Sequence, residues 1–84
     1  MYWDVIKVKI KEYLVLEVGF IDGLEGVVKI LPEHLTGVFE VLKEPRFFEC
    51  VYIDDGVVTW PGELDLAPDA MYEEIKAKGE WVLS

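Results

Sequence analysis

The sequence predicts a single α+β domain that spans residues 1–84, and three observations predict it. The first thirty residues alternate apolar and polar side chains, which is typical of half-buried strands. Two turns that contain Asp and Gly separate apolar runs, as the turns of β-hairpins do. Apolar residues recur at helical spacing after Pro68. We therefore expect an antiparallel three-stranded meander plus a β-hairpin, with a short middle helix and a C-terminal helix packed on the sheet.

The first two strands are predicted from strict alternation. Each has one apolar face, made of Ile6, Val8 and Ile10 in residues 4–11, and of Leu14, Leu16, Val18 and Phe20 in residues 14–20. A three-residue loop at 11–13 pairs Ile10 with Leu14 and sets Lys7 opposite Glu17. We prefer it to a two-residue loop at 11–12 because it buries one continuous apolar face.

The next turns are predicted from their glycines. Residues 21–23 form a three-residue loop in which Gly23 takes the left-handed conformation, so that Phe20 lies opposite Leu24 and Leu16 opposite Val28. Residues 54–56 repeat this chemistry between the apolar runs 50–53 and 57–60, and so predict the second hairpin.

Proline and glycine mark the remaining elements. Pro32 and Gly37 favour a short 3₁₀ turn near Glu33–Leu35, and Pro45 begins a helix over residues 45–49. The aromatic and aliphatic residues expected to cover the sheet are Phe39, Leu42, Phe47 and Phe48. The last helix begins at Pro68 and ends before Gly79, with Met71, Tyr72 and Ile75 facing inward.

The composition excludes some classes of function. The net charge is −9, from 17 acidic against 8 basic residues, and this field repels nucleic acids and anionic membranes while it attracts basic proteins. The single cysteine, Cys50, rules out an internal disulfide, and its apolar neighbours predict that it is buried. We expect no leader and no membrane span, because no apolar run approaches about 18 residues. The expected location is the cytoplasm.

Residues 52–75 hold seven carboxylates and no basic residue, which raises the possibility of a metal or acid/base site. Their spacing lacks the pattern of a calcium loop, and zinc would need more Cys and His than one of each. Asp54 and Asp55 fit turn positions, and Asp69 fits the first turn of a helix. His34 has no recognisable nucleophile as a partner. We expect no catalytic residue, no metal and no cofactor.

Three tryptophans in so short a chain need an explanation. Trp60, at the end of a strand, is expected in the core. Trp3 and Trp81 lie near the termini, where large aromatic residues either fasten the chain ends or mark an interface. The terminal "WVLS" is expected to pair as an extra strand, within the molecule or with a neighbour.

Three segments together resemble the prokaryotic domain-of-unknown-function 2442 family. They are "MYWDVIKVK", "GVFEVLKEPRFFECVYIDDG" and "VTWPGELDLAPDAMYE". The resemblance implies a compact α+β domain without an assigned activity, often encoded beside a small partner in toxin–antitoxin-like arrangements. Some members carry an added helix-turn-helix; this chain departs from that pattern, so direct DNA binding is not expected.

The sequence thus predicts an acidic, non-enzymatic protein-interaction module, and the family resemblance implies that it is the antitoxin-like half of a two-protein system. Its expected partner is a basic protein or a second copy of the chain. The interaction surface is expected to draw on aromatic and acidic residues, namely Trp3, Trp81, Trp60, Asp65, Asp69 and Tyr72. Two alternatives stay open: a small-ligand or metal-binding protein that uses the Trp60–Asp69 segment, and a transcriptional regulator that uses Lys7, Lys9, Lys11 and Lys29.

Overall fold

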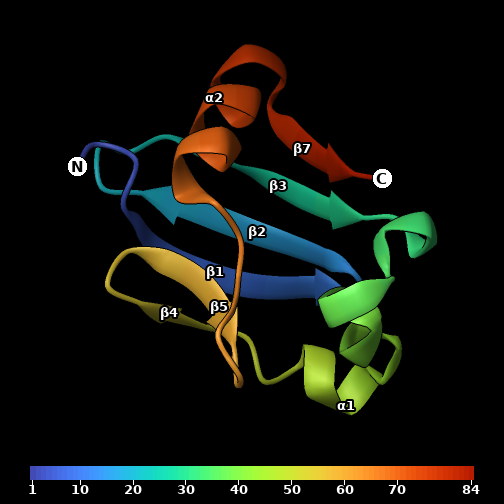
Figure 1. Cartoon of the computed structure of the whole chain (residues 1–84). Coiled ribbons are helices and arrows are strands. Elements are labelled where there is room, and N and C mark those ends of the chain that lie inside the picture. The colour runs from blue at the N-terminus through green and yellow to red at the C-terminus, as the bar shows by residue number, and fades with distance from the viewer.

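The computed structural model describes all 84 residues and contains two β-sheets around one core (Figure 1). The larger sheet has the order β1-β2-β3-β7, with bounds β1 Val5–Glu12, β2 Val15–Phe20, β3 Glu25–Ile30 and β7 Glu80–Leu83. The first three strands form the predicted antiparallel meander, and β7 adds to β3 in parallel. The smaller sheet has the order β4-β5-β6, with bounds β4 Tyr52–Asp54, β5 Val57–Trp60 and β6 Leu64–Asp65.

Four helical segments connect and cover these strands. Two are 3₁₀-helices, η1 Pro32–His34 and η2 Gly37–Lys43, and two are α-helices, α1 Pro45–Phe48 and α2 Pro68–Lys78. The predicted α+β class, middle helix and C-terminal helix are therefore confirmed. Among these helices, none combines the length and the apolar character needed to cross a membrane.

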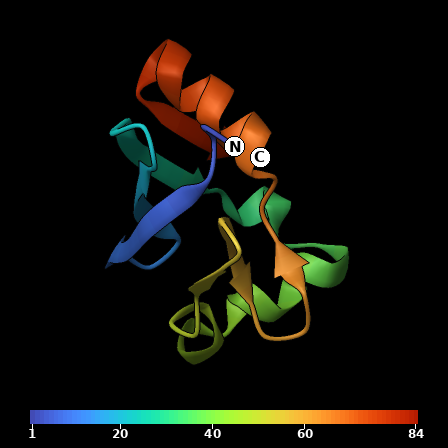
Figure 2. The same cartoon turned by 90° about the vertical axis from the view of Figure 1, so that its left-hand side faces the viewer.

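The core lies on one side of the larger sheet. Helix α2 and the smaller sheet both pack on that side, as the edge-on view shows (Figure 2). Seventeen buried residues form one cluster there, among them Leu16, Val28, Trp60 and Met71. The predicted inward stripe of α2 is confirmed, because Met71, Tyr72 and Ile75 are all buried. The other side of the sheet carries no covering element.

The predicted register between β1 and β2 is wrong by two residues. Ile10 lies opposite Leu16 instead of Leu14, and Lys7 lies opposite Gly19 instead of Glu17. The ladder also shifts between Val5 and Lys7, which leaves Ile6 62% exposed while Val5 is buried. A bulge of this kind changes which residues face inward, and alternation in the sequence cannot reveal it.

Three turns explain where the strands end. The β1–β2 loop was predicted at residues 11–13, but Glu12 pairs with Val15, so the loop consists of Tyr13 and Leu14. Leu14 takes the left-handed conformation there, with φ 66°, and is buried. The β2–β3 turn matches its prediction, with Gly23 at φ 95° and Leu16 opposite Val28. In the second hairpin Asp54 belongs to β4 and pairs with Val57, so the loop has two residues, Asp55 and Gly56, and not three. Both have positive φ, as a type I′ turn requires.

The parallel strand β7 depends on two glycines. Gly79 ends α2 at φ 81° and turns the chain directly into β7. At Gly26 of β3, a Cβ atom would lie 2.9 Å from the backbone oxygen of Gly79 and would collide with Ile75. The missing side chain at Gly26 therefore lets the end of α2 approach the sheet closely.

The middle segment was predicted in part. η1 and α1 lie close to the expected positions, and Leu42 and Phe48 are buried while Phe39 and Phe47 are half-buried. Helix η2 and strand β6 were not anticipated. Cys50 was predicted to be buried and is exposed, because it lies in the turn between α1 and β4.

Candidate functional site

The seven carboxylates of residues 52–75 do not converge. Asp54 and Asp55 lie at the β4–β5 turn, Asp65 lies in β6, and Asp69 lies in the first turn of α2. No three Asp, Glu, His or Cys side chains are placed to hold a metal ion. Glu63 lies in the turn before β6, and Glu73 and Glu74 lie within α2, so the seven acids are spread over separate elements.

The Trp60–Asp69 segment is built into the core. Trp60 is 0% exposed, and its indole N–H donates a hydrogen bond of 2.8 Å to the backbone oxygen of Phe48. Its neighbour Thr59 is also buried, and the Thr59 hydroxyl donates to a carboxylate oxygen of Asp65. The expectation that Trp60 is a core residue is confirmed. Its inclusion in an interaction surface is corrected, because no partner could touch a side chain that is fully enclosed.

A different group of aromatic side chains reaches the surface near the N-terminus. We define the N-terminal patch as Met1, Tyr2, Trp3, Ile21 and Tyr72. The ring of Tyr2 contacts the rings of Trp3 and Tyr72 edge to face, with centroids 4.8 and 4.9 Å apart. Tyr72 is buried and packs in the same way on Phe20 of the core, at 5.1 Å. The patch thus contains a series of packed aromatic rings that runs from the core to the surface.

The outer residues of the N-terminal patch are strongly exposed. Met1 is 71%, Tyr2 50% and Ile21 59% exposed. Ile21 comes next to the N-terminal residues because its backbone N–H donates a hydrogen bond of 2.9 Å to the backbone oxygen of Asp4. The backbones of two segments far apart in the sequence therefore lie side by side, and each segment carries exposed apolar side chains.

Asp22 and Tyr72 fasten this patch to helix α2. The Tyr72 hydroxyl donates a hydrogen bond of 2.5 Å to one oxygen of Asp22, and the other oxygen accepts 2.9 Å from the backbone N–H of Leu24. These bonds, led by the one from Tyr72, hold the pKa of Asp22 below its ordinary value. The same hydrogen bond, together with burial, raises the pKa of Tyr72 to about 12. At neutral pH Asp22 is therefore an anion and Tyr72 a neutral donor.

Negative charge surrounds the N-terminal patch. Asp4 follows the N-terminal residues, Asp22 lies in the β2–β3 turn, and Glu73 comes directly after Tyr72 in α2. Two cations are also close: the N-terminal ammonium of Met1 is paired with Asp4 at 3.2 Å, and the Lys76 ammonium lies 5.8 Å from the centre of the Tyr72 ring. Three carboxylates against two ammonium groups leave a small local excess of negative charge.

The six residues expected to form the interaction surface are divided by the fold. Trp3 and Tyr72 come together in the N-terminal patch, and Asp69 is exposed one helical turn before Tyr72. Trp81 lies in β7 beside Val28, and Asp65 lies in the smaller sheet. Tyr2 and Ile21 were missed; the signal for Ile21 was an isoleucine within a turn, where polar residues are usual.

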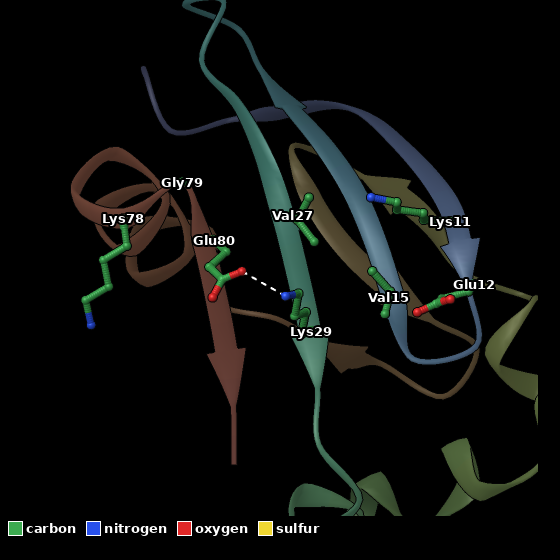
Figure 3. Close-up of a pocket in the computed structure, with 8 residues that line it drawn as sticks. All are labelled: Lys11, Glu12, Val15, Val27, Lys29, Lys78, Gly79 and Glu80. Carbon is green, nitrogen blue, oxygen red and sulfur yellow. Dashed lines mark ion pairs between the residues drawn. The ribbon is translucent and has the colours of Figure 1, made fainter.

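The outer side of the larger sheet contains a shallow hollow of about 410 Å³ (Figure 3). Its lining has three lysines and two glutamates around Val15 and Val27. Lys29 is bound to Glu80 at 3.0 Å, whereas the Lys78 side chain points away from the strands. Further along the same side, Lys7 is paired with Glu25 at 2.7 Å. Much of the positive charge on this side is therefore already matched by glutamates.

His34 and Cys50 lie apart from each other and from the N-terminal patch. Nδ1 of His34 is 3.5 Å from the backbone oxygen of Ser84, and its ring packs on Phe39 at 4.7 Å. Cys50 lies in the turn after α1, and its thiol donates a hydrogen bond to the backbone oxygen of Arg46 within α1. These contacts give both side chains a structural environment.

Comparison with known proteins gives one match. The family model described as Protein of unknown function (DUF2442) matches residues 5–77, which covers most of the chain. Neither the curated proteins nor the solved structures contain a match.

Proposed function

The chain belongs to the DUF2442 family of proteins of unknown function, and from the site geometry we propose that it is a non-enzymatic module that binds a basic protein through its N-terminal patch. The observation that carries this proposal is the exposure of Tyr2 and Ile21, with the Tyr2 ring packed on the buried ring of Tyr72 and carboxylates nearby. Aromatic side chains with rigid support are the typical anchors of protein interfaces.

The electrostatics support a basic partner. The chain carries a net charge of −9, and the acids nearest the N-terminal patch add to that field locally. An opposite charge on the partner raises the association rate by long-range attraction, and salt screens this attraction. Burial of Tyr2 and Ile21 would supply the apolar part of the binding energy.

We propose further that the module is the antitoxin-like half of a two-protein system. The support for this step is the resemblance of the chain to a family whose members are often encoded beside a small partner. An acidic module with an apolar anchor fits a neutralising role toward a basic protein.

A pull-down from the native host tests the proposal. We expect the tagged wild-type chain to retain a basic protein at low salt and to lose it progressively as salt is raised. A double variant, Tyr2→Ala with Ile21→Ser, should lose that protein. The matched control is Val38→Ser with Val41→Ser, which removes exposed apolar groups from η2; these side chains are 71% and 47% exposed.

Two results would overturn the proposal. One is recovery of the wild-type chain alone at every salt concentration. The other is equal recovery of the partner by the N-terminal patch variant and by the η2 control, with melting temperatures showing that both are folded.

The competing ligand-binding function has a separate test. A thermal-shift screen with divalent metals and small anions would reveal any ligand that binds the folded chain, because such a ligand raises the melting temperature. We expect none of these ligands to raise the melting temperature of the wild-type chain. A rise that disappears in an Asp65→Asn variant would favour the Trp60–Asp69 segment as the binding site.

A further inference from the structure

The outer edge of β7 has backbone groups with no partner strand. β7 is the last strand of the larger sheet and pairs with β3 on one side only. The backbone oxygens of Gly79 and Leu83 accept hydrogen bonds from Val27 and Leu31 of the β3 side, at 3.3 and 2.8 Å. Because backbone groups alternate along a strand, the N–H and C=O groups of Glu80 and Val82 point to the outer edge.

Three apolar side chains of β7 remain incompletely buried. Trp81 and Leu83 pack against the core from the inner side and are half-buried, and Val82 is 42% exposed on the outer side. A strand added beside β7 would cover all three. The same edge would therefore gain both backbone hydrogen bonds and apolar burial.

The opposite edge of the sheet is protected, and the β7 edge is not. β1 has irregular pairing at both ends, carries alternating lysines, and donates a backbone hydrogen bond from Val5 to Gly56 of the second hairpin. Bulges, lysines and covering segments are the usual devices that prevent edge pairing. β7 has no proline, no lysine and no bulge, and the charge of Glu80 is offset by Lys29 at 3.0 Å.

We propose that β7 is a self-association edge on which a second copy of the chain adds its own β7 antiparallel. In a two-fold register centred on Trp81, Glu80 faces Val82 of the partner and Val82 faces Glu80 of the partner. These are the residues whose backbone groups point outward, so the register uses every free group of both strands. It also sets the two Trp81 side chains opposite each other at a closely spaced pair and keeps the two Glu80 side chains apart.

This contact goes beyond the proposed partner-binding function, because β7 shares no residue with the N-terminal patch. The two contacts should also respond oppositely to salt. Two chains of charge −9 repel each other, so screening strengthens their dimer, whereas screening weakens a complex with a basic protein.

Analytical ultracentrifugation of the purified chain tests the self-association. We expect the average mass to rise from 9.7 kDa toward twice that value as the concentration rises from about 5 µM to about 1 mM. The diagnostic variant is Val82→Pro. Proline removes an N–H that points away from β3, so it blocks the outer edge and leaves the internal pairing intact. The matched control is Val82→Thr, which keeps the N–H and should associate like the wild type.

Amide hydrogen exchange gives an independent readout on the wild-type chain. We expect the amides of Glu80 and Val82 to be protected at high concentration only, and those of Trp81 and Leu83 to be protected throughout. A wild-type mass that stays at 9.7 kDa across the range would overturn the proposal. So would a Val82→Pro chain that associates like the wild type, or association that is lost in the Tyr2→Ala, Ile21→Ser variant. The Val82→Pro variant should still recover the basic protein in the pull-down. Loss of self-association with partner recovery intact concerns β7 alone, whereas loss of partner recovery in the wild type concerns the proposed function.

Discussion

The Trp60–Asp69 segment and the N-terminal patch contain the same kinds of residue and differ in exposure. Both combine aromatic rings with nearby carboxylates. In the first, the ring of Trp60 is fully enclosed and its N–H is bound to Phe48, and Asp65 is hydrogen-bonded to Thr59. In the second, Tyr2 and Ile21 stay exposed, and the Tyr2 ring packs on the rings of Trp3 and Tyr72. Burial, and not residue type, separates structure from surface here.

The two aromatic side chains differ in whether their contacts are satisfied within the molecule. Trp60 meets its hydrogen-bond requirement inside the molecule, so its removal is expected to affect folding. Tyr2 contributes one side of a ring contact and leaves half of its surface to the solvent.

Trp60→Ala should cause the largest loss of stability. The change removes a fully buried ring and leaves the Phe48 oxygen without its donor, so we expect a loss of about 3–5 kcal/mol in the free energy of unfolding. Urea denaturation followed by circular dichroism measures it. A loss below about 1 kcal/mol would mean that the segment is not part of the core.

The Asp22–Tyr72 hydrogen bond should make stability depend on pH at both extremes. The pKa of Tyr72 is raised, so its contribution is fully present below pH 10.0 and is lost as pH rises through about 12. The pKa of Asp22 is lowered, so its contribution is present above its ordinary value of 3.8 and is lost as pH falls through the folded value. Melting temperatures across pH measure both effects.

Tyr72→Phe is the matched variant for this pH dependence, since it keeps the ring contacts with Tyr2 and Phe20 and removes only the hydroxyl. The alkaline loss should then be smaller than in the wild type. An unchanged alkaline profile would show that the hydroxyl does not connect α2 to the β2–β3 turn.

Thr59→Val should have a smaller effect than Trp60→Ala. The substitution keeps the size of a buried side chain and removes its hydroxyl, while exposed Asp65 can bind water instead. We expect a loss of about 1 kcal/mol in the free energy of unfolding, measured by urea denaturation. A loss as large as that of Trp60→Ala would indicate that Asp65 organises the smaller sheet.

The sequence predicts regular elements well because their signals are local. The β2–β3 register follows from Gly23 and from parity, and α2 follows from Pro68, its apolar stripe and Gly79. The pairing of β1 with β2 is irregular near Ile6 and Lys11. The alternation of residues in the sequence does not reveal such bulges, so the predicted β1–β2 register was wrong. η2 carries no helix-start signal beyond Thr36, which makes no side-chain cap.

The candidate site was less predictable than the fold. Composition indicated that aromatic and acidic residues would matter, but only the fold decides that Trp60 is enclosed while Tyr2 is exposed. The N-terminal patch combines residues 1–4 with the β2–β3 turn and α2. No sequence spacing brings these three segments together.

The smallest effect on stability is expected at the surface of the N-terminal patch. Tyr2→Ala with Ile21→Ser should change the free energy of unfolding by no more than about 1 kcal/mol, because both side chains are at least half exposed. The same variant should lose the basic partner in the pull-down. Loss of stability comparable to that of Trp60→Ala would make the patch a structural cluster and remove the contrast.

The most direct measurement is backbone amide chemical-shift mapping of the ¹⁵N-labelled chain with the basic protein that it recovers. We expect the perturbed amides to lie in residues 1–4, in residues 21–23 and in the half of α2 around Tyr72, and to return toward their free positions as salt is raised. Perturbations centred on residues 60–69, with residues 1–4 and 21–23 unchanged, would contradict binding through the N-terminal patch.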